Sequence, residues 1–306
     1  MALTLVEAEK LSNDVLLQGI IETIIKDSPI LQMLPFIQIV GNGLSYTRET
    51  TLPTVDFYDV GDTWVESTPG FTKSTATLKI MGGDADVDNF LKSTRSNVQD
   101  LETAVIEQKA KAVRHEFEQQ FLYGNATTSP KQFDGIIKLI DTATASDQVI
   151  AMAAAGATLS LTKVDELIDA VKGGKPDMLL MSRRSRRKLQ VLARAAYSNV
   201  EVGKGALGEF VQLYNGIPIA ISDWILDTHA VGSSLESAYT GGACSTIYAL
   251  QFGEGALCGL SSPEMLQVER LGSLETKDAS RTRIKWYTSL ALFASVKAAA
   301  LIGVKD

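Results

Sequence analysis

The feature that most constrains this chain is a pair of segments, between residues 44 and 80, in which polar and apolar residues alternate with a period of two. Such alternation predicts two β-strands, at residues 44–49 and 74–80, joined as one long hairpin. The connection contains turn residues and aromatic rings: Pro53, Gly61, Pro69, Gly70, Phe57, Tyr58, Trp64 and Phe71. A two-stranded hairpin of largely polar residues is only marginally stable alone in water. It must therefore lie on another surface, either its own body or a neighbouring molecule.

A long amphipathic helix is predicted after the hairpin, over residues 94–123. Its apolar stripe consists of Val98, Leu101, Val105, Ala112, Phe117 and Phe121. Asp100 and Glu102 favour the helix N-terminus, where the helix dipole is positive. At 1.5 Å per residue this helix would span about 40 Å, the width of a small domain.

The remainder of the chain mixes helices and strands, which indicates the α+β class. Helices at 163–172 and 183–197 alternate with strands at 178–181 and 217–221, so a separate α/β domain is expected there. The C-terminal part favours strands at 246–252, 265–271 and 281–296. The apolar stretch 288–304 is short and contains Lys297, so we interpret it as a buried strand and not as a membrane span.

Composition indicates a folded protein with apolar surface to spare for neighbours. The 306 residues are 45% hydrophobic, and the mean hydropathy of +0.07 is high for a monomer in water. A net charge of −7 and a pI near 5.1 argue against a protein whose main task is to hold nucleic acid. Cys244 and Cys258 make no disulfide framework, and the acidic N-terminus does not look like a secretory signal. We expect a soluble protein of a reducing compartment.

Few residues could carry catalysis or hold a cofactor. His115 and His229 are the two imidazoles, and we interpret both as surface or interface residues. The dispersed His and Cys residues show no zinc-site spacing, so no catalytic residue, metal or cofactor is expected. Residues 203–208 match the G-x-G-x-x-G pattern of dinucleotide loops, but we favour a mobile loop. Three acidic residues after the hairpin suggest either a hydrated cation or, as we favour, a charged turn: Asp84, Asp86 and Asp88.

The order of these elements resembles one family over nearly the whole chain. SPILQMLPFIQIVGNGLSYTRE (28–49) is similar to an extended arm and first hairpin strand, and residues 94–125 are similar to a long "spine" helix. FDGIIKLI (133–140) and LYNGIPIAISDWI (213–225) are similar to the entry and a late strand of an axial domain. Together they resemble the Hong Kong 97-type major capsid protein of tailed phages, a fold shared with herpesvirus capsid floors and encapsulin nanocompartments.

The resemblance implies an α+β fold in five parts. These are an N-terminal arm (1–40), a hairpin called the E-loop (41–82), a peripheral domain with the spine helix (83–133), an axial α/β domain (134–262), and return strands of the peripheral domain (263–306). It further implies a major capsid protein that assembles into pentamers and hexamers, forming an icosahedral shell around double-stranded DNA. In such shells the E-loop lies across the peripheral domain of the adjacent subunit. The implied location is the virion capsid, assembled in the host bacterial cytoplasm.

On this basis we expect two sets of contact residues. Those between subunits are Arg48, Glu49, Trp64, Glu66, Phe71 and Lys73 in the hairpin, with Arg281, Arg283 and Lys285 receiving them. The densest basic run of the chain is Arg183, Arg184, Arg186, Arg187 and Lys188. We favour a solvated face with ion pairs for this run, and contact with packaged DNA or a scaffold is the alternative.

The resemblance also implies partners beyond the chain itself. They are a portal, a decoration protein and packaged DNA bound without sequence specificity, with no membrane. Because the chain starts almost directly with the arm, a separate scaffolding protein or prior processing is implied. The last asparagine is Asn215, so the lysine to asparagine cross-link of some relatives is not expected. An encapsulin-like compartment and an α/β enzyme of unknown substrate are the alternative functions.

Overall fold

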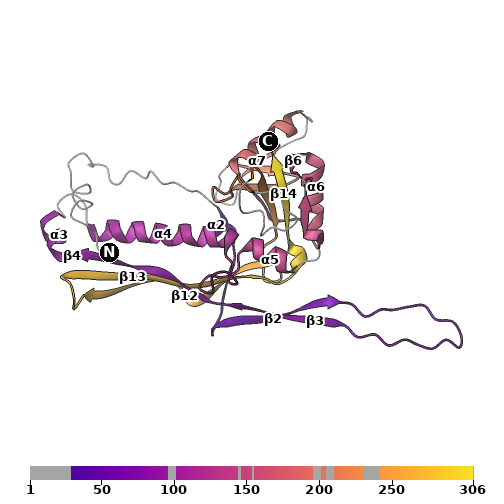
Figure 1. The fold of residues 1–306 in the computed structure, drawn as a ribbon, viewed down its shortest axis with the longest axis horizontal. Coiled ribbons are helices and arrows are strands. Elements are labelled where there is room, and N and C mark those ends of the chain that lie inside the picture. The colour runs from indigo at the N-terminus through magenta and orange to yellow at the C-terminus, as the bar shows by residue number, and fades with distance from the viewer. Residues whose placement is uncertain are drawn as a thin grey trace.

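The computed structural model describes residues 29–95, 101–143, 146–153, 155–195, 201–204, 210–229 and 242–305. Residues 1–28 of the expected N-terminal arm (1–40) therefore lie outside the described residues. The described parts form an elongated helix-on-sheet body, a hairpin that projects from it, and a second domain to one side (Figure 1).

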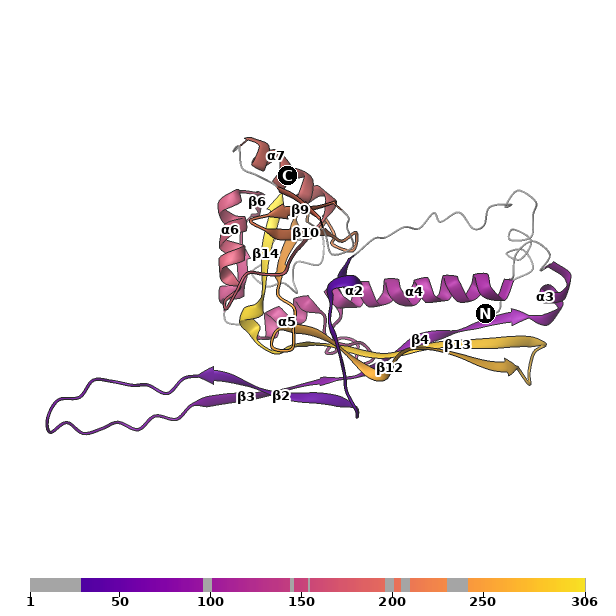
Figure 2. The same ribbon diagram turned by 180° about the vertical axis from the view of Figure 1, so that it is seen from behind.

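The elongated body is a four-stranded sheet with a helix along one face. Its strand order is β1 (Phe36–Gln38), β12 (Leu257–Ser273), β13 (Ala279–Leu292) and β4 (Lys79–Asp88), all antiparallel except the β1–β12 pair. Helix α4 (Leu101–Tyr123) lies along the sheet, and α2 (Ile30–Met33) and α3 (Asn89–Arg95) lie near its two ends (Figures 1 and 2). The rings of Phe117 and Trp286 stack at 4.7 Å between α4 and β13.

The helix predicted over residues 94–123 is confirmed for residues 101–123, but its apolar stripe is corrected. Phe117 and Phe121 are buried as predicted, and Ala104 and Val113 are buried with them, whereas Ala112 is exposed. Val113 lies four residues before Phe117, so the two share one helix face, and Ala112 is rotated about 100° away from it. Residues 96–100, which include Val98, lie outside the described residues.

The predicted hairpin is confirmed. Strands β2 (Gly43–Thr51) and β3 (Gly70–Thr77) pair antiparallel, with Leu44 opposite Ala76 and Thr47 opposite Lys73. Residues 52–69, here called the hairpin tip, form no strand and lie far from both domains (Figures 1 and 2).

The second domain is an α/β layer structure around an eight-stranded sheet. The strand order is β5 (Val149–Ala151), β14 (Ala298–Lys305), β11 (Ser245–Leu250), β7 (Met178–Met181), β10 (Ile217–Ile221), β9 (Phe210–Tyr214) and β8 (Glu201–Lys204), and β6 (Ala157–Thr158) pairs with β14. Its helices are α5 (Ile136–Ala143), α6 (Leu161–Ala170) and α7 (Arg183–Ala195), with a 3₁₀ turn at Ser146–Gln148. Strands β7, β11 and β14 are almost wholly buried, as expected for central strands of a covered sheet.

The apolar stretch 288–304 is not one strand, which corrects the prediction. It comprises the end of β13, a 3₁₀ turn at Ser295–Lys297 and most of β14. The break occurs where the chain leaves the sheet of the elongated body and enters the sheet of the second domain (Figure 1). Within the described residues, no helix is long and apolar enough to cross a membrane.

Replacing Gly82 by alanine is expected to weaken the β4–β13 pairing. An added Cβ would collide with the carbonyl oxygen of Ile284 and come within 2.9 Å of the Lys285 Cα. We expect the free energy of unfolding, measured in urea on disassembled subunits, to fall by about 1–3 kcal/mol. The control is Gly255→Ala, whose Cβ would meet no atom within 4 Å and which should change stability by less than about 0.5 kcal/mol. Equal losses in the two variants would contradict the close approach at Gly82.

Candidate functional site

The hairpin tip has a defined shape although it packs on no domain. The rings of Tyr58 and Trp64 stack across the loop at 4.4 Å, and the Val65 amide donates to the Tyr58 hydroxyl at 3.1 Å. A turn forms at Gly61, where the Asp62 amide donates to the Asp59 carbonyl at 3.1 Å. These internal contacts preorganise the tip, so binding would cost it less conformational entropy.

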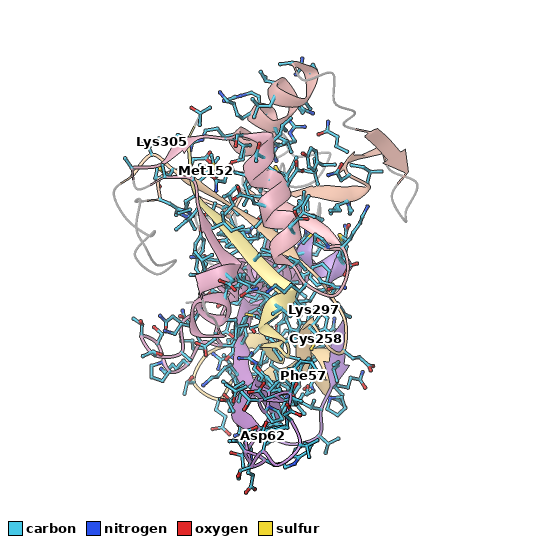
Figure 3. The ribbon with its side chains drawn as sticks, turned by 90° about the vertical axis from the view of Figure 1, so that its right-hand side faces the viewer. Phe57, Asp62, Met152, Cys258, Lys297 and Lys305 are labelled. Carbon is cyan, nitrogen blue, oxygen red and sulfur yellow. The ribbon has the colours of Figure 1, made fainter. Side chains whose placement is uncertain are left out.

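The tip also exposes unusually large apolar groups. Phe57 and Val60 are 101% and 102% exposed, and Trp64 is 79% exposed. In Figure 3, where the hairpin points toward the viewer, Phe57 and Asp62 lie at the lower end of the molecule and Lys305 at the upper end. Residues 52–69 include four carboxylates, those of Asp56, Asp59, Asp62 and Glu66, and no lysine or arginine. Large exposed apolar side chains, here including the rings of Phe57 and Trp64, surrounded by polar residues are typical of a protein contact site.

The root of the hairpin is clamped to its own chain through Tyr46 and Arg48. The Tyr46 hydroxyl donates to the Leu292 carbonyl at 3.1 Å, and Arg48 Nε donates to the Phe293 carbonyl at 2.9 Å. Arg48 Nη2 also donates to the Leu292 carbonyl, and the Tyr46 ring packs edge-on to Phe293. Burial raises the pKa of Tyr46 even though Arg48 opposes the shift. The clamp fixes the direction in which the hairpin leaves the body.

The contact residues expected on the hairpin thus fall into two groups, those on its projecting part and Arg48 at its root. Trp64, Glu66, Phe71, Lys73 and Glu49 lie on the projecting hairpin, and of these Trp64 and Phe71 are exposed large hydrophobics. Arg48 instead bonds to main-chain carbonyls of its own chain. Its role between subunits, like that of the other residues, stays a prediction.

Arg281, Arg283 and Lys285 form a ladder of ion pairs within the chain. Arg281 pairs with Asp86 through two bonds of 2.6 and 2.7 Å, and Arg283 pairs with Asp84 through bonds of 2.7 and 2.9 Å. Lys285 donates to Glu269 at 2.8 Å. The hydrogen bonds from Arg283 and Arg281 hold the pKa values of Asp84 and Asp86 below their usual range.

The aspartates 84, 86 and 88 therefore do not form the charged turn that the sequence suggested. They lie on strand β4, because the two-residue alternation of the hairpin continues through residue 88. Among the residues that the structure describes, no group of three or more His, Cys, Asp or Glu side chains is arranged to hold a metal ion.

The basic run lies on helix α7, where ion pairs account for part of its charge. Arg183 makes two bonds to Asp223, at 2.5 and 2.8 Å, and Arg184 lies 3.5 Å from Asp227. Arg187 is exposed and Lys188 half-buried on the same helix. The solvated face with acidic neighbours is thus confirmed for Arg183 and Arg184.

The Nε of Arg186, on the same helix α7, is buried and has no hydrogen-bond partner.

The glycine motif of residues 203–208 falls mostly outside the described residues. Its first two residues, Gly203 and Lys204, end strand β8, which pairs antiparallel with β9 and so is no part of a parallel βαβ unit.

A polar junction, which the sequence did not indicate, joins α4 to the second domain. Glu118 is fully buried and accepts bonds from Arg114 at 3.0 Å and from the Trp224 indole at 3.1 Å. The Tyr123 hydroxyl donates to the Trp224 carbonyl at 3.0 Å and lies 3.2 Å from His229 Nε2. Trp224 and His229 lie about a hundred residues from Glu118 and Tyr123 in the sequence, so no local pattern could have paired them.

The interpretation of His229 as a surface or interface residue is wrong for the isolated chain. Its ring is buried, and Nδ1 lies 3.0 Å from the Thr246 hydroxyl. Burial lowers the pKa of His229, and Asp227 opposes this shift. His115 is half-buried and packs edge-on to Trp224 at 5.7 Å between ring centres. Both histidines of the chain therefore lie at or beside this junction.

Comparison with known proteins gives one consistent result. The model of the phage capsid family matches residues 11–233. Among solved structures, an encapsulin complex from Synechococcus elongatus superposes with a TM-score of 0.70 at 16% identity, over 100% of this chain and 97% of the other. The capsid of a GTA particle gives 0.63 at 17%, over 98% and 100%. A structure from Microbacterium phage Oxtober96 gives 0.63 at 17%, over 100% of both chains. Among curated proteins, none matches.

Acidification is expected to destabilise the junction through His229. The folded-state pKa lies below the ordinary value of 6.5, so the unfolded chain takes up the proton first and stability falls as pH drops below about 6.5. The stability that neutral His229 contributes to the folded state is complete above that pH. Below it, this contribution falls by up to about 1.4 kcal/mol per pH unit. Urea unfolding of His229→Gln should lack this part of the pH dependence. A His115→Gln variant keeps the buried His229 imidazole and should therefore keep this pH dependence. If the pH dependence were lost only in the His115→Gln variant, its assignment to His229 would be contradicted.

Proposed function

The chain belongs to the phage capsid family and is a major capsid protein with the Hong Kong 97-type fold, and from this premise we propose that its copies form pentamers and hexamers that close into an icosahedral shell around double-stranded DNA. The observation that carries the proposal is the hairpin tip, whose shape is set internally while its rings remain in water. Burying one such ring against a neighbour would contribute roughly 1.5–3 kcal/mol. Many contacts of this size, closed by symmetry, suffice for a stable shell.

The inter-subunit contacts proposed are those of the hairpin with the peripheral domain of the adjacent copy. The hairpin contributes Glu49, Trp64, Glu66, Phe71 and Lys73, with Arg48 holding the direction of its root. The adjacent copy would offer the surface around Arg281, Arg283 and Lys285, whose carboxylate partners keep these cations ordered. An ordered, largely neutralised ladder loses little side-chain entropy on contact.

Further partners belong to the same proposal. A portal, a scaffolding protein and a decoration protein would complete the virion, and assembly would take place in the cytoplasm of the host bacterium. The phage capsid family is a family of structural proteins, so we propose no enzymatic activity. The encapsulin-like compartment remains the alternative within the fold, and gene neighbourhood distinguishes the two: terminase and portal genes against a cargo enzyme.

Removing the exposed rings of the tip should weaken assembly without unfolding the subunit. In the double variant Phe57→Ser/Trp64→Ser we expect an unchanged circular dichroism spectrum and at least a tenfold rise in the protein concentration needed for shells. Electron microscopy and light scattering measure the outcome. The control is Val191→Ser on α7, also an exposed apolar residue at 51%, which should assemble normally. Shells of the double variant at the wild-type concentration would contradict the proposal.

The second expectation for the basic run, contact of α7 with packaged DNA through phosphates, is tested on Arg187 and Lys188. We expect Arg187→Glu/Lys188→Glu to assemble normally, but to bind a short random-sequence duplex more weakly and with a shallower dependence on salt. The matched control is Lys172→Glu/Lys175→Glu, which makes the same change of charge on a loop of the axial domain. Equal weakening in both variants would indicate net charge and not a site on α7.

A further inference from the structure

A polar cavity lies where the hairpin, the elongated body and the second domain meet. It has a volume of about 260 Å³ and is lined by residues of strands β2, β3, β4 and β13 and by parts of the segment 126–139, which ends in α5 (Figures 1 and 2). A water molecule occupies roughly 30 Å³ in the liquid, so the cavity has room for a polyatomic ion with part of its hydration shell.

The lining of this cavity is positively charged although the chain as a whole is acidic. Arg48, Lys79 and Lys138 contribute three cations, and Asp134 is the one carboxylate among the described residues of the lining. The formal charge of the lining is therefore +2, against −7 for the whole chain. A cleft lined by charges of one sign concentrates ions of the opposite sign. The cavity therefore favours an anion.

Two of these cations are held by acceptors that do not neutralise them. Arg48 donates through Nε and Nη2 to two carbonyls and a hydroxyl of its own chain. A guanidinium carries five N–H donors, and Nη1, which carries two of them, makes no hydrogen bond to any described residue. Lys79 donates one of its three N–H groups to the Pro130 carbonyl at 2.8 Å. Both side chains are thus fixed in place and still have donors and charge to offer.

A buried hydroxyl lines the same cavity. Ser289, on β13, is 3% exposed, and its hydroxyl makes no hydrogen bond to any described residue. A buried polar group without a partner is costly, so an unpaired hydroxyl at a cavity wall indicates a partner inside the cavity. Ser74, on β3, lines the cavity as well and adds a further hydroxyl.

These groups together match the chemistry of phosphate. Guanidinium and ammonium groups are the side chains that bind phosphate most often, and hydroxyls add neutral donors. A phosphate ester has three strong acceptor oxygens, so it can accept from donors that reach it from several strands at once. A phosphate dianion would also balance the charge of the lining.

We propose that this cavity is a binding site for a phosphate group, which Arg48, Lys79 and Ser289 hold between the root of the hairpin and the elongated body. The inference goes beyond the proposed function and does not depend on shell formation. Because Lys138 of α5 also lines the cavity, a bound phosphate would link the hairpin root to the second domain as well. Free inorganic phosphate and the phosphates of nucleic acid share this chemistry.

Titration of disassembled subunits with inorganic phosphate, at an ionic strength held constant with sodium chloride, tests the site. We expect isothermal titration calorimetry to give one phosphate per chain, and the midpoint of urea unfolding to rise with phosphate concentration. Lys79→Gln should weaken phosphate binding at least tenfold. The matched control is Lys172→Gln, which removes the same charge from an exposed loop and should leave the affinity unchanged.

Ser289→Ala separates a binding role from a structural one. Without phosphate this variant should be as stable as the wild type or more stable, because it removes a hydroxyl that has no partner. With phosphate it should show a smaller rise of the urea midpoint than the wild type. A loss of stability without phosphate, together with an unchanged phosphate response, would contradict the role of Ser289.

A short DNA duplex without terminal phosphates distinguishes the two sources of the ligand. If the duplex displaces bound inorganic phosphate, and Lys79→Gln weakens this competition, the nucleic-acid backbone supplies the phosphate group. If inorganic phosphate binds and the duplex does not displace it, free phosphate is the ligand. Absence of binding by both, or equal weakening in Lys79→Gln and Lys172→Gln, would overturn the site and leave the capsid function standing.

If a variant fails to fold, the wild-type protein alone decides. Amide hydrogen exchange of β2 and β3 near Arg48 and Ser74 should slow when phosphate is added, whereas exchange in the hairpin tip should not change. Equal exchange at the hairpin root with and without phosphate would rule out the site.

Discussion

The whole structure depends on the packing of one helix against one strand, α4 against β13. Phe117 lies at the centre of this contact, with Trp286 stacked on it at 4.7 Å and the rings of Phe36 and Phe133 within 6 Å. Phe36 follows α2, and Phe133 precedes α5, so a single cluster fixes the entry of the chain and its exit into the second domain. The same core continues through Ile140, Met178 and Tyr248 into the eight-stranded sheet. One hydrophobic cluster therefore spans both domains, which accounts for their defined relative placement, while the second domain has a further cluster of its own around Leu179 and Leu301.

Hydrogen bonds of polar side chains then fix the connections that apolar packing alone does not determine. Glu118 and Tyr123 join α4 to the loop around Trp224, and Arg48 and Tyr46 join the hairpin to the end of β13. In both places side chains donate to main-chain carbonyls, that of Trp224 at the junction and those of Leu292 and Phe293 at the hairpin root. Burial strengthens such bonds and makes their loss costly, so they set direction as well as stability. The hairpin can extend into solvent because these hydrogen bonds hold its root, and not its tip, to the body.

Local patterns in the sequence predicted much of this architecture. The two-residue alternation predicted the hairpin, and the spacing of Phe117 and Phe121 predicted the face of α4, because both patterns reflect burial of one side of a regular element. Patterns failed where tertiary contacts decide. His229 is polar and lies in a loop, yet it is buried because Tyr123 and Thr246 bond its ring. The stretch 288–304 is continuously apolar, and only the presence of two separate sheets explains its break at Ser295–Lys297. The inter-subunit and DNA contacts depend on molecules outside one chain and remain proposals.

Two chain segments cross between the domains side by side, and this has a mechanical meaning. The chain passes from β11 directly to β12 and returns from β13 through one short turn to β14, while β12 pairs with β13 and β11 with β14. The two crossings are also bonded to each other, because the Phe293 amide donates to the Ala256 carbonyl and the Gln251 amide donates to the Lys297 carbonyl. Two bonded crossings resist bending and twisting between the two domains in a way that a single connecting segment would not.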